Sequence, residues 1–545
     1  MIKVVKTVAL LSGCLLMPVS AYASPPPPLD VDGNPIDSNA TDPDSNLPPE
    51  MLNYMIRGGF KTRVEVARIL REREKFQKTE NPLFGAPPIK RKHMVRGTIE
   101  VPVLPFLYSD TKKEPFSRRQ LQDQLYGTGT GAWSITTHYD SMSYGQLNLT
   151  GEVRNWVKSN YSNAQTTRST LGRTLTEVLK ANDKSLDYSQ FDNDGPDRKP
   201  NSGDDDGIVD FITFVQPNIG NECGRSTGDV HSHKFSLEYY KEGEYITNDF
   251  RKTLDDTGNK IPMLDANGNK IPIRVKEYLI NPAISCNERD IIEVGVYAHE
   301  YGHAFALPDL YNTSSPRTSS GIANWGLMGG GNWGGDHLSP DRPTHMLAWS
   351  KEYLGWIQPR EIKEDINDVE LFPILTSGDA LRIDYTATHD PADQKYLLLT
   401  YRKNEGFEDS LPGSGLLITE IHDQVIAAGM LTNQVNTIAN LHGINIIAAN
   451  GSVDMNRPGA ITSRDHLFTP AVHGNELPEV VTKKIGVSLC NIRQESDRMI
   501  LDIKFDVTTC PEEPPTGPVF GAAGQIDSTP SSFNDIISAI LRGPK

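Results

Sequence analysis

The chain has 545 residues, 37% hydrophobic and 23% charged, which is ordinary for globular protein and enough for two or three domains. Its formal net charge of -16 argues against nucleic acid or an anionic membrane as a partner, because both require clustered Lys and Arg. An acidic surface does suit calcium.

Residues 1–23 have the pattern of a cleaved secretory signal peptide. A basic start is followed by an apolar run and the small residues Ala21 and Ala23. The sequence around Cys14 also resembles a lipoprotein cleavage box, but the apolar run continues past it. We therefore expect secretion, to the periplasm or outside the cell, and no later stretch is apolar and long enough to span a membrane.

Residues 24–96 form a leader. Its first part, to residue 49, is rich in Pro, Asp, Asn and Ser, which predicts disorder. Residues 61–76 have helical apolar spacing, and a basic run follows at 89–96. Two interpretations remain open: the leader is the propeptide of a zymogen, cleaved at the basic run, or the helix packs permanently on the next domain.

Residues 97–359 mix strand and helix patterns and predict a catalytic domain of the α/β or α+β class, of which we take α+β. Strand patterns occupy 97–110 and 207–217, and a helix pattern occupies 170–183.

After residue 359 the pattern changes to short alternating strands. We expect a β-sandwich-like domain over 360–508, without helices between the strands, and then a Pro-rich linker and tail over 509–545. We expect no internal repeat in the chain.

Four cysteines remain after signal removal, an even number in an exported chain, which predicts two disulfides. Neighbourhood in sequence favours Cys223 with Cys286 and Cys490 with Cys510, although three pairings are possible. No CxxC is present, so we do not expect a cysteine zinc site.

The stretch "AHEYGHAFALPDLYN", residues 298–312, holds two histidines four residues apart. On a helix, neutral His299 and His303 would share one face and both reach a single Zn²⁺, with Glu300 placed to deprotonate a bound water. Pro308 must end the helix, so the chain bends and Asp309 is our candidate third ligand. The alternative is a solvated polar helix with Asp309 as a turn residue.

Two further features favour the metal site. Gly302 costs a helix about 1 kcal/mol relative to Ala, so something other than helix stability selects it. Met328 lies in the glycine-rich stretch "NWGLMGGGNWGG", where a Met-turn beneath the metal is expected. We expect Asn287 or Asp290 to cap the helix.

The chain resembles the M6 family of secreted bacterial metallopeptidases, the immune inhibitor A group. The resemblance covers roughly residues 96–506, and its main segments are "MSYGQLNLTGEVRNWV", "HEYGHAFALPDLYN", "WGLMGGGNW" and "RPTHMLAWSKEYLGWIQP". It implies a zincin-like (metzincin-like) catalytic domain, a propeptide, zinc and structural calcium. His299 and His303 match the histidine ligands, Glu300 the catalytic glutamate and Asp309 the acidic position.

One position departs from the family pattern. The family usually has Gly where this chain has Ala306, and Gly allows the positive φ of the turn, which Ala resists by roughly 1 kcal/mol or more.

The segment 191–211 places carboxylates around turn-forming glycines, as calcium sites do. Our candidate ligands are Asp192, Asp194, Asp206 and Asp210. A solvated acidic loop is the alternative.

A peptidase also needs a donor for the oxyanion of its tetrahedral intermediate. His345 is the candidate we retain, with Tyr301 as a second, and a structural role is the alternative for each. His231 and His233 would form a second site or, more simply, pack near the first disulfide.

The sequence therefore predicts a secreted zinc endopeptidase that acts on proteins or peptides. A binding or adhesion protein on a peptidase scaffold is the first alternative, and Ala306 is the one residue in its favour. The second is a zinc hydrolase acting on a non-peptide bond.

Overall fold

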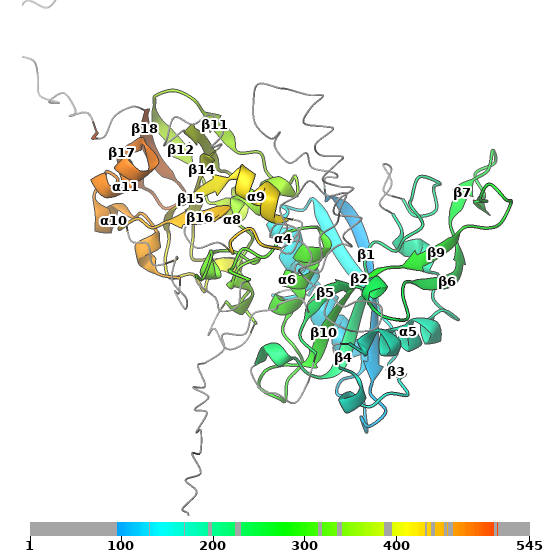
Figure 1. Ribbon diagram of the computed structural model, residues 1–545. Helices are drawn as coiled ribbons and strands as arrows, with labels where there is room; N and C mark the ends of the chain where they lie inside the picture. The colour runs from blue at the N-terminus through cyan, green and yellow to red at the C-terminus, as the bar shows by residue number, and fades with distance from the viewer. Residues whose placement is uncertain are drawn as a thin grey trace, which may run out of the picture.

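The computed structural model describes residues 95–510 except for short internal gaps (Figure 1). The gaps are 130, 168, 194–198, 224–229, 314–318, 335–339, 386–394, 431–432, 438–441, 452–454, 456–461 and 506–508. The predicted signal peptide, nearly all of the leader and the C-terminal tail lie outside the described residues. In the described part, no helix is apolar and long enough to cross a membrane.

The N-terminal half is built on a mixed sheet with the strand order β2-β1-β4-β10-β5, and a short β3 also pairs with β1. Its strands are β1 (Gly97–Leu107), β2 (Leu147–Val153), β3 (Val157–Lys158), β4 (Thr213–Ile219), β5 (His233–Ser236) and β10 (Glu277–Ile284). All neighbours are parallel except β5, which pairs antiparallel with β10 at the edge. The strand that we expected over 207–217 corresponds to β4, which begins only at Thr213.

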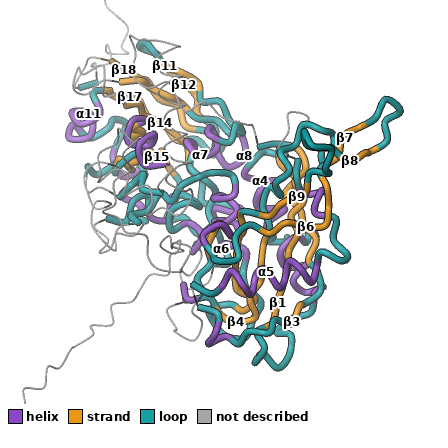
Figure 2. The backbone as a smooth tube through the Cα atoms, turned by 45° about the vertical axis from the view of Figure 1, so that its right-hand side comes forward, coloured by secondary structure: helices purple, strands orange, loops and turns teal. Residues whose placement is uncertain are grey.

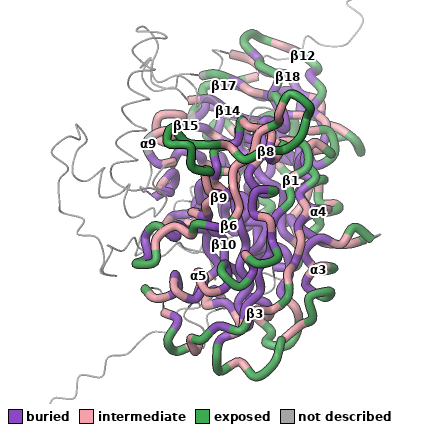
Figure 3. Tube along the Cα trace, turned by 90° about the vertical axis from the view of Figure 1, so that its right-hand side faces the viewer, coloured by how far each residue is buried: buried purple, intermediate pink, exposed green. Residues whose placement is uncertain are grey.

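Helices cover both faces of this sheet. Successive side chains of β1 point to opposite faces and so enter different hydrophobic clusters. Val101 and Val103 enter one hydrophobic cluster, which also contains side chains of α3 (Arg118–Tyr126), α4 (Ile135–Met142) and α6 (Val294–Ala304). Leu104 and Phe106 enter another cluster on the opposite face, with α5 (Leu171–Asn182). The helix expected at 170–183 is confirmed, and Figure 3 shows the central strands largely buried.

The C-terminal half contains two mostly antiparallel sheets, with strand orders β11-β13-β14-β15-β16 and β12-β18-β17. The first sheet comprises β11 (Arg360–Ile362), β13 (Leu381–Tyr385), β14 (Lys395–Arg402), β15 (Gly415–His422) and β16 (Ile444–Ile447). The second comprises β12 (Ile366–Leu371), β17 (Val487–Gln494) and β18 (Met499–Phe505). Side chains of both sheets share one hydrophobic cluster, so they pack face to face. The α+β class with a sandwich-like second part is confirmed.

The two halves share a core. Along β14, Leu397 and Leu399 point into the sandwich, whereas Tyr396 and Leu398 enter the cluster that contains α4 and α6. The five-stranded sheet therefore packs its second face on the N-terminal half. We keep the domain boundary near residue 359 as a prediction.

The expectation that no helix interrupts the C-terminal strands was wrong. Among the described residues, four short α-helices lie between them, namely α8 (Ile374–Ser377), α9 (Asp423–Gly429), α10 (Pro470–His473) and α11 (Glu479–Ile485). None is longer than seven residues, which is too short for a reliable apolar period in the sequence.

A short repeat also escaped the sequence reading. A projecting arm carries β6 (Tyr245–Phe250), β7 (Lys252–Leu254), β8 (Lys260–Pro262) and β9 (Pro272–Val275), and β7 and β8 lie at its tip in Figure 2. Asp255 and Asp265 each accept hydrogen bonds from the backbone N–H groups two and four residues later. Gly258 and Gly268 both have φ of 83°. The same turn is thus built twice.

Both predicted disulfides form, Cys223 with Cys286 and Cys490 with Cys510. The first joins the segment before β5 to the segment between β10 and α6.

Candidate metal centre

The helix predicted to carry His299 and His303 is α6, and it begins after Glu293. The expected caps were wrong, because Asn287 and Asp290 instead belong to the preceding turn, in which the Asp290 N–H donates to Asn287 Oδ1 at 3.0 Å. The helix ends at Ala304, before Pro308, so the chain turns away and returns Asp309 toward the two histidines.

The imidazoles of His299 and His303 are oriented by backbone carbonyls. Nδ1 of His299 lies 2.8 Å from the Leu327 carbonyl oxygen, and Nδ1 of His303 lies 2.8 Å from that of Leu307. A carbonyl only accepts, so each Nδ1 must carry the proton. In the neutral imidazole, Nε2 is then left with its lone pair, as metal binding requires.

Both Nε2 atoms converge on one carboxylate oxygen. Asp309 Oδ1 lies 3.0 Å from Nε2 of His299 and 3.2 Å from Nε2 of His303. Across the described residues, these three side chains form the one group of at least three His, Cys, Asp or Glu whose ligand atoms all lie within 4.8 Å of one another. Two imidazole nitrogens and a carboxylate oxygen are a donor set that suits zinc.

The Asp309 carboxylate is completely buried. Burial alone would raise its pKa, but with the charged forms of His303 and His299 the Coulombic attraction and hydrogen bonds outweigh burial and hold the pKa of Asp309 below its usual range. With neutral imidazoles, a bound cation would supply that positive charge instead. The side chain is therefore an anion, as a metal ligand must be.

A residue that the sequence analysis missed also holds Asp309. Asn433, from the C-terminal half, donates from Nδ2 to Asp309 Oδ2 at 2.5 Å and accepts from the Asp309 backbone N–H on Oδ1 at 2.6 Å. The two residues are 124 positions apart. No local pattern in the sequence could have revealed this contact.

Glu300 lies between the histidines with only 1% of its surface exposed. Burial raises the pKa of its carboxyl to about 8, and the carboxylates of Asp309 and Glu222 add to the rise while His299 opposes it. A divalent cation nearby would favour the charged form. Glu300 Oε1 is buried with no hydrogen-bond partner among the described residues, which leaves an acceptor for a bound water.

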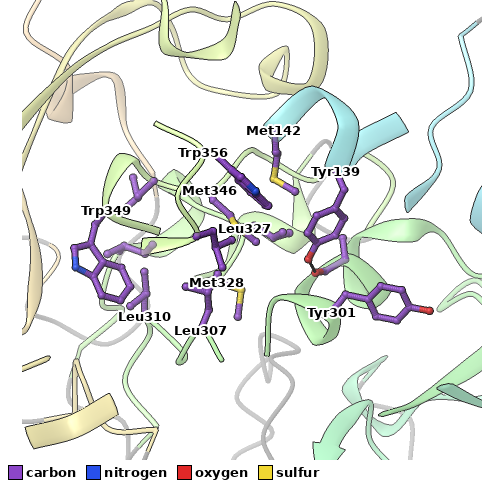
Figure 4. Packing of buried hydrophobic residues seen from close by; sticks show 14 of the residues in the cluster. Tyr139, Met142, Tyr301, Leu307, Leu310, Leu327, Met328, Met346, Trp349 and Trp356 are labelled. Carbon is purple, nitrogen blue, oxygen red and sulfur yellow. Dashed lines mark hydrogen bonds between the residues drawn. The ribbon is translucent and has the colours of Figure 1, made fainter. Parts of the chain in front are cut away.

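Met328 packs against α6, which carries the candidate ligands His299 and His303 (Figure 4). A Cβ added to Gly302 would lie 2.3 Å from Met328 Sδ, so the helix approaches this close only because residue 302 has no side chain. The neighbouring Leu327 supplies the carbonyl that orients His299. The glycine-rich turn therefore both supports the helix and orients His299, one of the candidate ligands.

Ala306 adopts a φ of 65° in the turn between the helix and Asp309. The chain thus retains the left-handed turn that glycine favours, at the cost of strain in a residue with a Cβ.

His345 is not a member of the group formed by His299, His303 and Asp309. Its Nδ1 lies 3.3 Å from Nζ of Lys351, and its ring packs against His138 and Phe407. The Tyr301 hydroxyl hydrogen-bonds to those of Tyr126 and Thr213 in the core. These contacts support the structural role for each residue, and an oxyanion donor at His345 or Tyr301 stays a prediction.

His233 does not join His231 in a ligand group. Its Nε2 lies 3.0 Å from the Tyr278 hydroxyl and its Nδ1 lies 2.8 Å from the His231 carbonyl oxygen. These contacts support the packing interpretation.

The candidate calcium ligands are only partly within the described residues, since Asp194 lies in a gap. Asp192 is buried, and its Oδ2 accepts from the Gly207 N–H at 2.9 Å. Asp206 Oδ1 accepts from the Ile208 N–H at 2.8 Å, and the Asp210 N–H donates to Phe191. The calcium site stays a prediction.

A cavity of about 1050 Å³ lies elsewhere, at the junction of the halves, with Tyr144, Trp356, Arg360 and Arg493 among its lining residues. None of the metal-group residues lines it. The chemistry of the donor set, rather than cavity size, locates the candidate site.

Comparison with known proteins points to a family of metallopeptidases. Residues 106–357 match the family described as immune inhibitor A peptidase M6, catalytic domain. Pre-pro-metalloprotease PrtV of Vibrio cholerae serotype O1 (strain M66-2) is 24% identical over 386 residues, covering 62% of this chain and 39% of that protein. Immune inhibitor A of Bacillus thuringiensis subsp. alesti is 27% identical over 286 residues, covering 46% of this chain and 38% of that protein. The chain thus spans about two-fifths of the length of these curated relatives.

Proposed function

We propose, since the chain belongs to the M6 peptidase family through residues 106–357, that it is a secreted zinc-dependent endopeptidase that hydrolyses protein substrates. The single observation that carries this proposal is the convergence of both histidine Nε2 atoms on Asp309 Oδ1 beside a buried glutamate.

In this proposal His299, His303 and Asp309 hold the metal. Zinc bound there supplies a Lewis acid that polarises the peptide carbonyl and lowers the pKa of a water molecule. Glu300 accepts the proton of the attacking water on its free Oε1 and then passes the proton to the leaving amine nitrogen. The buried surroundings of Glu300 support this role, because burial brings a carboxyl pKa toward neutrality.

Export and activation are part of the proposal. The Vibrio relative is named a pre-pro-metalloprotease, which agrees with our expectation of a signal peptide over 1–23 and a propeptide over 24–96. We also propose a structural calcium near Asp192, Asp206 and Asp210, completed by Asp194.

The test compares wild type with Glu300→Gln, which keeps the shape of the side chain but cannot accept the proton. Glu293→Gln is the matched control, since it makes the same change at the N-cap of the same helix. We expect wild type and control to bind one zinc and cleave casein, and Glu300→Gln to bind zinc but lose about 10²–10⁴-fold in rate.

Other outcomes would reject parts of the proposal. If wild type binds no zinc, the metal assignment fails, and if Glu300→Gln cleaves normally, Glu300 is not the base. If mature wild type binds zinc but cleaves no peptide, ester hydrolysis would favour the non-peptide hydrolase. No hydrolysis of either substrate would favour the binding protein.

A further inference from the structure

The ligand loop after α6 is held by a segment of the C-terminal half. Asn433 contacts Asp309, Asn436 Nδ2 donates to the Leu310 carbonyl at 2.8 Å, and Thr437 accepts on its carbonyl from Asn312 Nδ2 at 3.2 Å. All of these side chains are buried. Because three consecutive contacts join the same two segments, the loop and the C-terminal half are fixed to each other.

Asn433 is the partner that reaches the metal group. Asp309 turns Oδ1 toward both histidines, so its position in the site depends on what holds Oδ2. Within the described part of the chain, Asn433 Nδ2 is the hydrogen-bond partner of that second oxygen. Without this donor, a buried carboxylate oxygen would be left unsatisfied and the carboxylate free to rotate.

The chemistry of residue 433 is specific. The Asp309 N–H needs an acceptor and Asp309 Oδ2 needs a donor, and an Asn amide offers one of each. Asn433 also has a φ of 57°, a conformation that Asn, Asp and Gly adopt more readily than other residues. Aspartate in its place would keep the acceptor but set a second negative charge against Asp309.

We infer that Asn433 is a positioning residue for the metal ligand Asp309, so that the metal centre is completed by the C-terminal half of the chain. This inference rests on the proposed role of Asp309 as a ligand. It predicts that zinc affinity depends on a residue that does not itself bind the metal.

The experiment measures zinc affinity of the full-length mature protein by competition with a chelator. Asn433→Gly removes the side chain without straining the backbone, and Asn433→Asp tests the charge in a side chain of the same shape. Asn436→Ala is the control, because it disturbs the same segment without touching the carboxylate. Thermal unfolding of each metal-free protein separates stability from affinity.

We expect both Asn433 variants to weaken zinc binding by about 10–100-fold, as loss of a ligand's hydrogen-bond partner typically does. Asn436→Ala should lower thermal stability with little effect on zinc affinity. In an Asp309→Ala background, Asn433→Gly should cause no further loss, because the group that it positions is gone.

Three results would overturn the inference. These are unchanged zinc affinity in Asn433→Gly and Asn433→Asp, an equal loss in Asn436→Ala, or a full additional loss in the Asp309→Ala background. If Asp309→Ala itself binds zinc as wild type does, the proposed ligand set fails, whereas a weakened Asp309→Ala with unaffected Asn433 variants rejects the inference alone.

Discussion

Gly302 of α6 lies directly against Met328, so that a Cβ at residue 302 would stand 2.3 Å from Met328 Sδ. Both residues belong to the buried interior, with Met328 only 1% exposed. The glycine that weakens the helix is therefore the residue that lets the helix rest on the turn.

Gly302→Ala should consequently act against helix propensity. At an exposed helix position the change would stabilise by about 1 kcal/mol, but here the added methyl group overpacks the core and should cost roughly 1–3 kcal/mol. Urea unfolding measures the difference. The double variant with Met328→Ala should lose less than the sum of the single variants, and strict additivity would show that the two side chains do not compete for space.

Ala306→Gly should stabilise the protein by roughly 0.5–1 kcal/mol, because relief of the positive φ exceeds the entropy that glycine adds to the unfolded chain. Ala304→Gly, two residues earlier and still within α6, is the matched control and should destabilise by up to about 1 kcal/mol. Thermal unfolding of both variants checks the signs. A loss in both would mean that the turn does not strain Ala306.

The Arg402–Glu408 ion pair is buried where the halves meet. Arg402 Nε lies 2.9 Å from Glu408 Oε2, and its Nη1 donates to the Trp325 carbonyl at 2.9 Å. Glu408→Gln leaves a buried guanidinium without its counter-charge and should cost about 3–5 kcal/mol. The neighbouring pair of Asp409 with Arg342 is 40% exposed on both sides, so Asp409→Asn should cost less than about 1 kcal/mol. Equal losses in urea unfolding would contradict this account.

Acid should destabilise the protein through His138. Its ring is fully buried between His345 and Phe407, and neither ring nitrogen has a hydrogen-bond partner among the described residues. Burial, assisted by the charge of Lys351, lowers the pKa of His138 to about 3. Between that value and about 6.5, the unfolded chain binds a proton that the native chain does not. The free energy of unfolding therefore decreases as the pH is lowered, by up to about 1.4 kcal/mol per pH unit for this group.

His138→Phe keeps an aromatic ring in this place and removes the titration. Between pH 7 and pH 5, wild type should lose up to roughly 2 kcal/mol more stability than the variant. Some acid sensitivity should persist in the variant, because burial also lowers the pKa of His345. If wild type and His138→Phe lose the same unfolding free energy between pH 7 and pH 5, His138 is excluded as a source of the acid sensitivity.

The parts of the site that sequence reasoning found are local. His299, Glu300 and His303 share one helix, and Asp309 follows a proline, so spacing alone brings them together. Met328 could be placed only by pattern, and its contact with Gly302 required coordinates. In the fold, the strong strands and α5 followed from periodicity.

What escaped prediction depends on distant or very short elements. Asn433 meets Asp309 across 124 positions, and the four short helices of the C-terminal half are packed into place by their surroundings. His345 was singled out only because it follows the Met-turn in sequence, and the contact of its ring with His138 could not be read from that position. Side-chain direction of that kind is set by tertiary packing.

The most direct test of the metal centre is anomalous diffraction at the zinc edge from crystals of the mature protein grown with zinc. The account predicts one strong peak at about 2.0–2.2 Å from Nε2 of His299, Nε2 of His303 and a carboxylate oxygen of Asp309. A zinc peak that lacks any of these three ligands, or no peak at this group, would contradict it.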